Sequence, residues 1–324
     1  MENLYDLIIL GAGPAGLSAG LYGARGMMKT LIIEKNMLVG GQISTTSEIE
    51  NYPGGMISES GTELTMRMKN QAVNFGCEFK TDTIIDLDLE SNIKTLTGES
   101  GTIYKSKSII LATGASPRLV GAPGEKEYTG RGVSYCATCD GFFVRDLEVF
   151  VIGGGDTAVE EAIFLTKFAK KVNIVHRRDK LRAAKSIQEK AFKNEKINFF
   201  WDTVVEEMKG DPIRGLESIV LKNKITGEIT EHSGGDKPIG VFVLVGNVPN
   251  TELLKDKLVV NPGGFLITDE KTLNVKLSST GDNLEGVYAT GDCREKLLYQ
   301  VITASADGAI AAVVSEKYVE EKFN

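Results

Sequence analysis

The feature that most constrains this chain is a glycine pattern that it contains twice. The apolar run DLIILG leads into GAGPAG, so Gly11, Gly13 and Gly16 have the spacing G-x-G-x-x-G ahead of a helix-like stretch. In a strand–turn–helix unit of this kind, the first glycine permits a tight turn, the second lets a pyrophosphate approach the backbone, and the third lets the helix pack closely. The N–H groups at the start of the helix favour phosphate. The pattern predicts a dinucleotide-binding unit.

The same pattern returns 142 residues later (153 − 11 = 142) in LEVFVIG, which leads into GGGDTAVEEA. Gly153, Gly155 and Ala158 take the three positions, and alanine is tolerated at the third. A chain that repeats this unit is expected to be an α/β protein with two Rossmann-like dinucleotide-binding domains.

The residue that ends the second strand differs between the two units, and this difference separates the two expected ligands. Glu34 ends TLIIEK, where a carboxylate accepts from ribose hydroxyls and repels a 2′-phosphate. The matching position in VNIVHRR is His176, followed by Arg177 and Arg178, and Arg182 adds a third charge. Paired guanidiniums bind phosphate, although a solvated basic run at a helix start is the alternative interpretation. The first unit is therefore expected to take FAD or NAD, and the second NADPH.

The order of the motifs predicts that one domain is inserted in the other. SIILATGASP and GVYATGDC both run from a strand into A-T-G, and the second glycine unit lies between the first of them and GVFVLVGNVPNT. The predicted FAD-binding domain is therefore discontinuous, residues 1–116 and 246–324, and the NADPH-binding domain is residues 117–245. Gly, Pro and Asn are frequent near both crossings, as they are in hinges and linkers.

The stretch SYCATCDG raises a choice between a zinc clamp, an inert buried pair and a redox dithiol for Cys136 and Cys139. Zinc usually needs four ligands, and the chain has two further cysteines, two histidines and no second C-x-x-C. A dithiol that closes across one helical turn exchanges with a partner disulfide through its thiolate, so we favour a redox pair with Asp140 beside it. Because NADPH delivers a two-electron hydride, a flavin is the usual intermediary, which predicts a flavoprotein disulfide reductase.

Composition excludes some classes of protein. With a net charge of −7, the chain is not expected to bind nucleic acid through its phosphates. No apolar stretch approaches the roughly 18 residues that cross a bilayer, so no membrane association is expected, and MENLYDLIILGAG is not typical of a targeting peptide. Four cysteines are too few for a disulfide scaffold, which favours a reducing, cytoplasmic setting, and no metal is expected.

Taken together, the motifs resemble those of bacterial-type, low-molecular-weight thioredoxin reductases over essentially the whole chain. GAGPAG, GGQ, ENYPG, ATGASP, CATCDGFF, GGGDTAVEEA, HRRDKLRA, VGNVPNT and ATGD follow one another in the order and spacing of that family. CATCDG together with HRRxxxRA is highly specific, whereas the glycine spacing alone is not. The resemblance implies an enzyme that reduces thioredoxin with NADPH through FAD, as a homodimer without a separate interface domain.

The resemblance also implies roles for individual residues. Cys139 would face the flavin, Cys136 would attack the disulfide of thioredoxin, and Asp140 would act as the nearby general acid and base. The NADPH domain would rotate between one arrangement in which the dithiol meets the flavin and another in which the nicotinamide does. The residues expected around FAD are Gly11, Gly13, Pro14, Ala15, Gly16, Glu34, Lys35, Gly41, Gln42, Asn51, Thr113, Gly114, Gly291, Asp292, Gln300, Val301 and Ile302. The residues expected around NADPH are Gly153, Gly155, Asp156, Thr157, Ala158, His176, Arg177, Arg178 and Arg182.

Several other residues receive structural interpretations. Cys77 and Cys293 are expected to be packing residues, and His232 a surface residue in the turn TEHSGG. Glu160 and Glu161, on the helix after the second glycine pattern, are expected on a solvated face or in dimer contacts.

The sequence departs from the family pattern at one position and leaves four alternative functions to consider. Many relatives have arginine where Tyr299 precedes Gln300, which leaves the flavin-phosphate or interdomain contacts at this position open. A reductase of the same architecture can serve another disulfide protein, such as a peroxiredoxin or a glutaredoxin-like partner. The related alkyl hydroperoxide reductase flavoprotein usually has an extra N-terminal redox module, for which a first glycine at residue 11 leaves no room. The HRR motif argues against a ferredoxin-linked relative, which does not need it. The presence of both the dithiol and Asp140 argues against a non-catalytic redox sensor.

Overall fold

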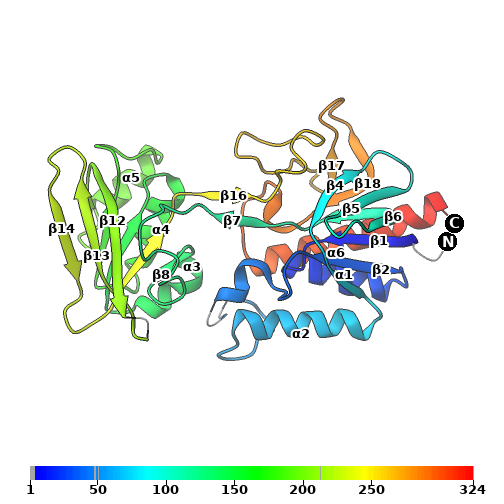
Figure 1. Cartoon of the computed structure of the whole chain (residues 1–324). Coiled ribbons are helices and arrows are strands. Elements are labelled where there is room, and N and C mark those ends of the chain that lie inside the picture. The colour runs from blue at the N-terminus through cyan, green and yellow to red at the C-terminus, as the bar shows by residue number, and fades with distance from the viewer. Residues whose placement is uncertain (1–3, 47–48, 50, 212, 324) are drawn as a thin grey trace. The chain divides into compact units, whose positions relative to one another are not determined.

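The computed structural model describes residues 4–46, 49, 51–211 and 213–323, so Glu50 of the ENYPG motif lies outside the described residues. The chain forms two compact units (Figure 1). We call Met1–Ser116 with Val248–Asn324 the discontinuous unit, and Pro117–Asn247 the inserted unit. The sequence predicted crossings after residues 116 and 245, and the unit boundaries fall after residues 116 and 247. The segments at the two crossings, β7 (Ala115–Pro117) and β16 (Asn247–Pro249), pair with each other.

The discontinuous unit is built on a sheet whose main strand order is β17-β18-β6-β1-β2-β3. The strands from β18 to β3 are parallel, and β17, β5 and β4 add antiparallel pairs. Leu7, Ile8 and Ile9 on the central strand are fully buried, as expected for a parallel strand covered on both faces. The strands are β1 (Leu4–Leu10), β2 (Thr30–Glu34), β3 (Glu78–Thr81), β4 (Ile84–Asp88), β5 (Lys94–Gly98), β6 (Ile103–Leu111), β17 (Asn274–Lys276) and β18 (Asn283–Ala289).

The helices of this unit are brought together by small residues. A Cβ on Gly308 would run into the backbone carbonyl of Ala15, so α1 and α6 approach as closely as they do because residue 308 is glycine. Pro14 begins α1, where its missing N–H leaves no hydrogen bond unmade. The helices are α1 (Pro14–Arg25), α2 (Gly61–Asn74) and α6 (Val301–Phe323), with short 3-10 turns η1 (Gly41–Thr45) and η3 (Gly291–Cys293).

The inserted unit repeats the same parallel arrangement in the order β11-β10-β9-β15-β8. Val149 and Val151 of β9 pack with α4, and Phe150 and Ile152 pack against the antiparallel layer β12-β13-β14 on the other face. The strands are β8 (Val133–Ser134), β9 (Glu148–Ile152), β10 (Lys171–Val175), β11 (Ile197–Phe200), β12 (Thr203–Asp211), β13 (Gly215–Asn223), β14 (Ile229–Ser233) and β15 (Ile239–Val243). The helical segments are α3 (Ala137–Asp140), η2 (Gly141–Val144), α4 (Asp156–Leu165) and α5 (Lys185–Phe192).

The orders β3-β2-β1-β6-β18 and β11-β10-β9-β15-β8 correspond strand by strand, which confirms the predicted α/β fold with two Rossmann-like units. One local prediction was wrong. His232 lies in β14 rather than in a turn, and its half-buried ring packs against Phe150 and Phe200 with centroid distances of 5.6 and 5.0 Å. Within the described residues, no helix is both long enough and apolar enough to cross a membrane.

Candidate active site

The turn between β1 and α1 in the discontinuous unit leaves room for a ligand at its second glycine. Gly11 has a φ of 109°, and a Cβ there would collide with the carbonyl of Ala112. Gly13 caps α1, and the nearest atom to a Cβ built on it is the Gly40 carbonyl oxygen, 4.0 Å away. The space beside Gly13 is thus open, next to the N–H groups of the first helical turn, and it fits a pyrophosphate.

Glu34 is fixed at the edge of this turn by two backbone groups. One carboxylate oxygen accepts from the N–H of Ala12 at 2.8 Å, and the other accepts from the N–H of Asn36 at 3.0 Å. A carboxylate has about four acceptor sites, so capacity remains for a ribose hydroxyl. The neighbouring Lys35 is exposed.

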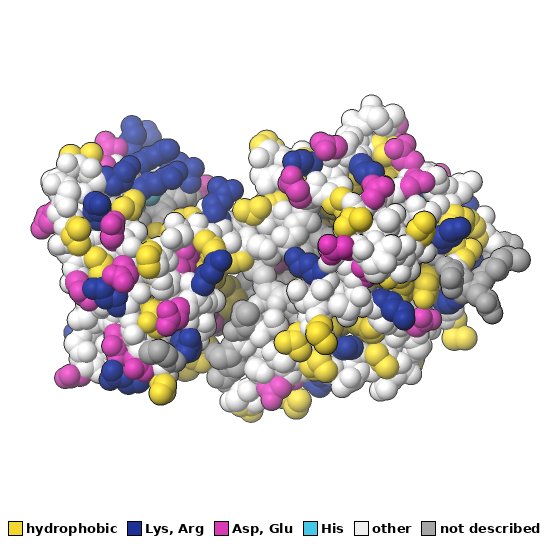
Figure 2. Space-filling view, viewed as in Figure 1, with side chains coloured by type: hydrophobic (Ala, Val, Ile, Leu, Met, Phe, Trp, Pro, Cys, Tyr) yellow, Lys and Arg dark blue, Asp and Glu magenta, His cyan; other side chains and the backbone are white. Residues whose placement is uncertain are grey.

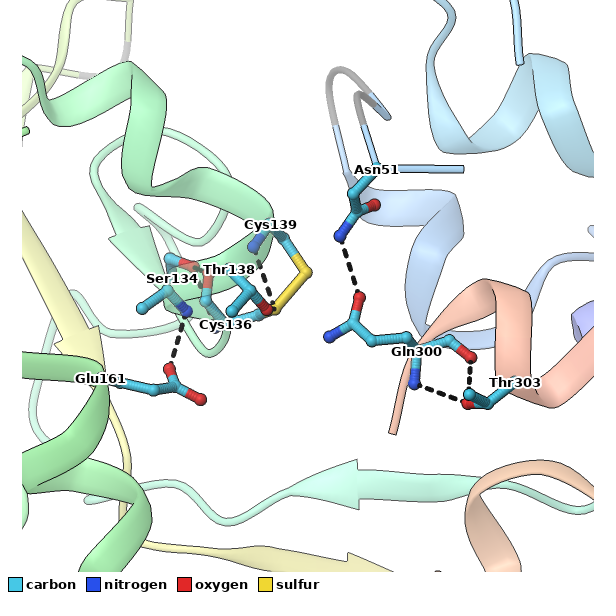
Figure 3. Close-up of a disulfide and its surroundings, with 9 residues drawn as sticks. Asn51, Ser134, Cys136, Thr138, Cys139, Glu161, Gln300 and Thr303 are labelled. Carbon is cyan, nitrogen blue, oxygen red and sulfur yellow. Dashed lines mark hydrogen bonds between the residues drawn. A yellow bond between two sulfur atoms is a disulfide. The ribbon is translucent and has the colours of Figure 1, made fainter. Parts of the chain in front are cut away.

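The start of α6 joins a distant segment of the same unit. Asn51 Nδ2 donates to Gln300 Oε1 at 2.9 Å, and the Gln300 N–H donates to Thr303 Oγ1 at 3.2 Å (Figure 3). Val301 is buried and Ile302 is exposed in the first turn of the helix. The two amide side chains thereby fix the helix start, where polar ligand groups meet backbone N–H groups.

The segment after β6 is also rich in polar groups. Thr113 Oγ1 is buried and has no hydrogen-bond partner, while the Thr113 and Gly114 carbonyls accept from Asn250 at 2.9 Å each. Gln42 Nε2, beside Gly41, donates to the Ala115 carbonyl. An unsatisfied buried hydroxyl beside an open glycine turn is the kind of group that a bound ligand satisfies.

Asp292 lies beside a lysine that also contacts a second aspartate of the same unit. Lys296 Nζ is 3.4 Å from Asp292 and 3.3 Å from Asp307, and the Gly291 N–H donates to Asp307 at 3.1 Å. Burial raises the pKa of Asp292, and Lys296 opposes that shift. Tyr299, the departure from the family pattern, packs on Phe265 with the Lys296 ammonium 5.8 Å from its ring centre.

The second glycine turn has the same open position as the first. Gly155 caps α4, and the nearest atom to a Cβ built on it is Arg182 Nη2, 3.9 Å away. A Cβ on Gly153 would lie 2.6 Å from the Cβ of Ala158, so this position is closed to larger residues. Asp156 accepts from the Ala184 N–H at 2.6 Å, which ties the start of α4 to the segment that carries the arginines.

The side chains after β10 divide into a buried ring and exposed charges. His176 is only 5% exposed, and its Nδ1 is 3.0 Å from the Gly153 carbonyl, so Nδ1 carries the proton that this bond requires. Burial lowers the pKa of His176, which favours the neutral ring. Arg177, Arg178 and Arg182 are exposed, as is Thr157 on α4, and Figure 2 shows Lys and Arg side chains gathered on this unit.

Cys136 and Cys139 form a disulfide with their Cα atoms 5.3 Å apart (Figure 3). Cys136 caps α3, and its sulfur lies 3.2 Å from the N–H of Cys139 and 3.3 Å from Thr138 Oγ1. Ser134 Oγ accepts from the Cys136 N–H at 3.1 Å. The pair is thus held in a short helical turn, one of the environments that favour a reactive thiolate.

Two carboxyl groups lie next to this disulfide in the inserted unit. Burial raises the pKa of Asp140, which keeps its carboxyl closer to the protonated form that a general acid needs. Glu161 Oε2 accepts from the N–H of Ala137 at 2.8 Å (Figure 3), whereas Glu160 is exposed. Of the two expectations for Glu161, a solvated face is wrong, because α4 packs against α3 and the sequence gives no sign of that contact, and a dimer contact stays a prediction.

The predicted residues fall into two groups. Those expected around FAD lie in the discontinuous unit, and those expected around NADPH, with the dithiol, lie in the inserted unit. The sequence pointed to Asn250 only as part of the VGNVPNT motif, and it did not point to Lys296 or Asp307. Cys77 and Cys293 are buried free thiols, and burial raises the pKa of each.

The chain is similar to known proteins over almost its whole length. Residues 5–308 match the model of the family described as pyridine nucleotide-disulphide oxidoreductase. The chain is 58% identical to a thioredoxin reductase of Peptoclostridium litorale, covering 100% of this chain and 99% of the relative. It is 42% identical to a thioredoxin reductase of Bacillus subtilis, covering 99% and 96%. The crystal structure of thioredoxin reductase from Streptococcus pyogenes superposes with a TM-score of 0.89 at 44% identity, covering 99% of this chain and 100% of that one.

Proposed function

This chain belongs to the pyridine nucleotide-disulphide oxidoreductases and, within them, to the thioredoxin reductases, and on that premise we propose how its residues move electrons from NADPH through FAD to oxidised thioredoxin. It is an oxidoreductase whose cofactors are FAD and NADPH. The observation that supports the proposed route is the Cys136–Cys139 disulfide, which lies in the same unit as the three exposed arginines.

The glycine turns and their flanking side chains are proposed to bind the two cofactors. The open backbone at Gly13 and the fixed carboxylate of Glu34 fit FAD, whose ribose carries free hydroxyls. The open backbone at Gly155 with Arg177 and Arg178 fits NADPH, whose 2′-phosphate takes charge-assisted hydrogen bonds. When bound, FAD carries an electron pair from the nicotinamide to the disulfide.

The protein's own groups then handle sulfur and proton chemistry. Reduction of the disulfide takes two electrons and two protons and yields the thiols of Cys136 and Cys139, with Asp140 in place to exchange a proton. The Cys136 thiolate attacks one sulfur of the thioredoxin disulfide, which forms a mixed disulfide and releases the other sulfur as a thiolate. Cys139 then attacks Cys136 Sγ, which restores the internal disulfide and releases the second thioredoxin thiol.

We also propose that the enzyme is a cytoplasmic homodimer. The resemblance of its motifs to those of low-molecular-weight thioredoxin reductases implies a homodimer, and two buried free cysteines accord with a reducing compartment. Sedimentation analysis of the holoenzyme tests the oligomeric state.

A coupled assay tests the proposed substrate. Purified holoenzyme is mixed with NADPH and, in separate reactions, with oxidised thioredoxin, a peroxiredoxin or a glutaredoxin-like protein, and the nicotinamide absorbance is followed. We expect about one NADPH to be consumed per thioredoxin disulfide and slower turnover with the other partners. Preferential turnover of the peroxiredoxin would instead favour the alternative reductase.

The Cys136→Ser variant separates the two halves of this route. NADPH should still reduce the flavin of this variant, because no part of the cofactor sites is changed, whereas thioredoxin reduction should be lost. A variant that still reduces thioredoxin would contradict the role proposed for Cys136.

A further inference from the structure

The first turn of the dithiol helix is held by a carboxylate from a neighbouring helix. Glu161 Oε2 on α4 accepts from the N–H of Ala137 at 2.8 Å. Ala137 is fully buried, and its peptide nitrogen is bonded to the carbonyl carbon of Cys136. The anchor therefore acts on the backbone of the redox pair itself, between its two cysteines.

This side chain satisfies a donor that would otherwise be without a partner. The first N–H groups of a helix have no acceptor within the helix, and Cys136 Sγ already lies beside one of them, that of Cys139. Removing the acceptor from a buried N–H costs the desolvation of that group. Glu161 thus stabilises the conformation in which the two sulfurs face each other.

When ionised, the anchor also carries a charge, and this distinguishes it from an ordinary helix cap. Burial raises the pKa of the Glu161 carboxyl, and the hydrogen bond from the Ala137 N–H opposes that shift. A carboxylate beside the dithiol disfavours a thiolate on either cysteine, since like charges repel. A less stable thiolate makes the reduced pair less favourable relative to the disulfide, and so lowers the reduction potential. A strongly reducing dithiol suits an enzyme that passes electrons onward.

We propose that Glu161 is a positioning residue that holds the CxxC turn through the Ala137 N–H and keeps the Cys136–Cys139 couple reducing through its charge. The inference rests on the proposed function only in taking this pair as the redox centre. The neighbouring carboxylates Glu160 and Asp140 are unchanged in the variants below.

Two substitutions separate the charge from the hydrogen bond. Glu161→Gln removes the charge but keeps an oxygen that can accept from Ala137, whereas Glu161→Ala removes both. The matched control is Glu189→Gln, which removes one exposed carboxylate from α5 of the same unit. Each holoenzyme is equilibrated with defined ratios of reduced and oxidised dithiothreitol at pH 8, quenched and alkylated, and the Cys136–Cys139 peptide is quantified by mass spectrometry.

We expect Glu161→Gln and Glu161→Ala to raise the midpoint potential by about 15 to 30 mV, a threefold to tenfold change in the equilibrium constant. Glu189→Gln should match the wild type. Hydrogen exchange at the Ala137 amide should accelerate at least tenfold in Glu161→Ala and stay near the wild-type rate in Glu161→Gln.

Unchanged potentials in both Glu161 variants would overturn the charge role, and unchanged exchange in Glu161→Ala would overturn the anchoring role. Neither readout involves thioredoxin. Failure of the proposed function would appear separately, as wild-type protein whose disulfide equilibrates with dithiothreitol but is not reduced by NADPH.

Discussion

The two glycine turns of this molecule have the same backbone arrangement, but the side chain that supports each turn differs. One side chain accepts a hydrogen bond from its turn, and the other donates a hydrogen bond to its turn. In the discontinuous unit, a carboxylate oxygen of Glu34 accepts from the N–H of Ala12. In the inserted unit, the ring of His176 donates to the carbonyl of Gly153. The two residues occupy equivalent positions, since 34 + 142 = 176 and 11 + 142 = 153.

We propose that this difference lets one fold hold two cofactors. A carboxylate that supports the turn also places negative charge where a 2′-phosphate would lie. A neutral imidazole supports the turn without that charge and leaves the electrostatics to the exposed Arg177 and Arg178. We therefore propose that different side chains support the turn and select the ligand in the inserted unit, whereas one side chain does both in the discontinuous unit.

The largest expected effect comes from exchanging the third residues of the two glycine patterns. A Cβ on Gly16 would run into the carbonyl of Gly11, whereas Ala158 is already accommodated in the inserted unit. We expect Gly16→Ala to cost about 2 to 4 kcal/mol of stability and to abolish FAD retention. The reciprocal Ala158→Gly should cost about 0.5 to 1 kcal/mol.

Thermal unfolding and flavin absorbance of the purified variants measure both changes. If Gly16→Ala retains FAD as well as Ala158→Gly does, the two turns are equally tolerant and do not differ in packing at the third position.

The next largest effect concerns the charges beside His176. Arg177→Ala combined with Arg178→Ala removes two charge-assisted hydrogen bonds, each of roughly 1.5 to 3 kcal/mol. NADPH should bind at least about tenfold more weakly, while NADH changes little because it has no 2′-phosphate. The matched control is Lys190→Ala with Lys193→Ala, which removes two exposed positive charges elsewhere in the unit. Calorimetric titration with both nucleotides is the measurement, and equal losses for NADPH and NADH would contradict the assignment.

The smallest effect is a pH dependence confined to the inserted unit. Burial lowers the pKa of His176 from its usual 6.5, so the unfolded chain takes up a proton at higher pH than the folded one. Stability should therefore decline as pH falls below about 6.5. Both histidines and the single tryptophan, Trp201, lie in this unit, so Trp201 fluorescence reports its unfolding.

A His176→Asn variant isolates this contribution, because titrations of the carboxylates are common to both proteins. The cost of the substitution should be greatest near pH 7.5 and should shrink toward pH 5, where the wild type itself loses the benefit of a neutral ring. A cost that is constant across this range would argue against a buried neutral His176. His232→Asn provides a comparison, since burial lowers the pKa of His232 as well.

The parts of the site that the sequence predicted are those set by local spacing. The glycine patterns, the ends of β2 and β10 and the C-x-x-C pair each depend on neighbours within a few residues, and their residue types carry the chemistry. The matching strand orders of the two units also follow from a repeated βαβ pattern. The cofactor roles of the individual residues remain predictions.

Other features depend on packing between distant segments, which periodicity does not encode. The bond from Glu161 to Ala137 arises because α4 lies against α3, and the burial of His232 arises because β14 covers β9. The inward orientation of His176 depends on the close approach of Gly154, where a Cβ would collide with the imidazole ring. These contacts join residues between 22 and 82 positions apart (176 − 154 = 22 and 232 − 150 = 82).

The proposal places FAD in the discontinuous unit, and NADPH with the dithiol in the inserted unit. Its most direct test is to count the cysteine thiols that form when a nucleotide is added. FAD-loaded protein is incubated anaerobically with equal concentrations of NADPH or NADH, and FAD-stripped protein with NADPH, before alkylation and mass analysis of Cys136 and Cys139. We expect both cysteines to be alkylated when FAD and NADPH are present together, and to remain largely oxidised with NADH or without FAD. Equal alkylation in all three samples would contradict it.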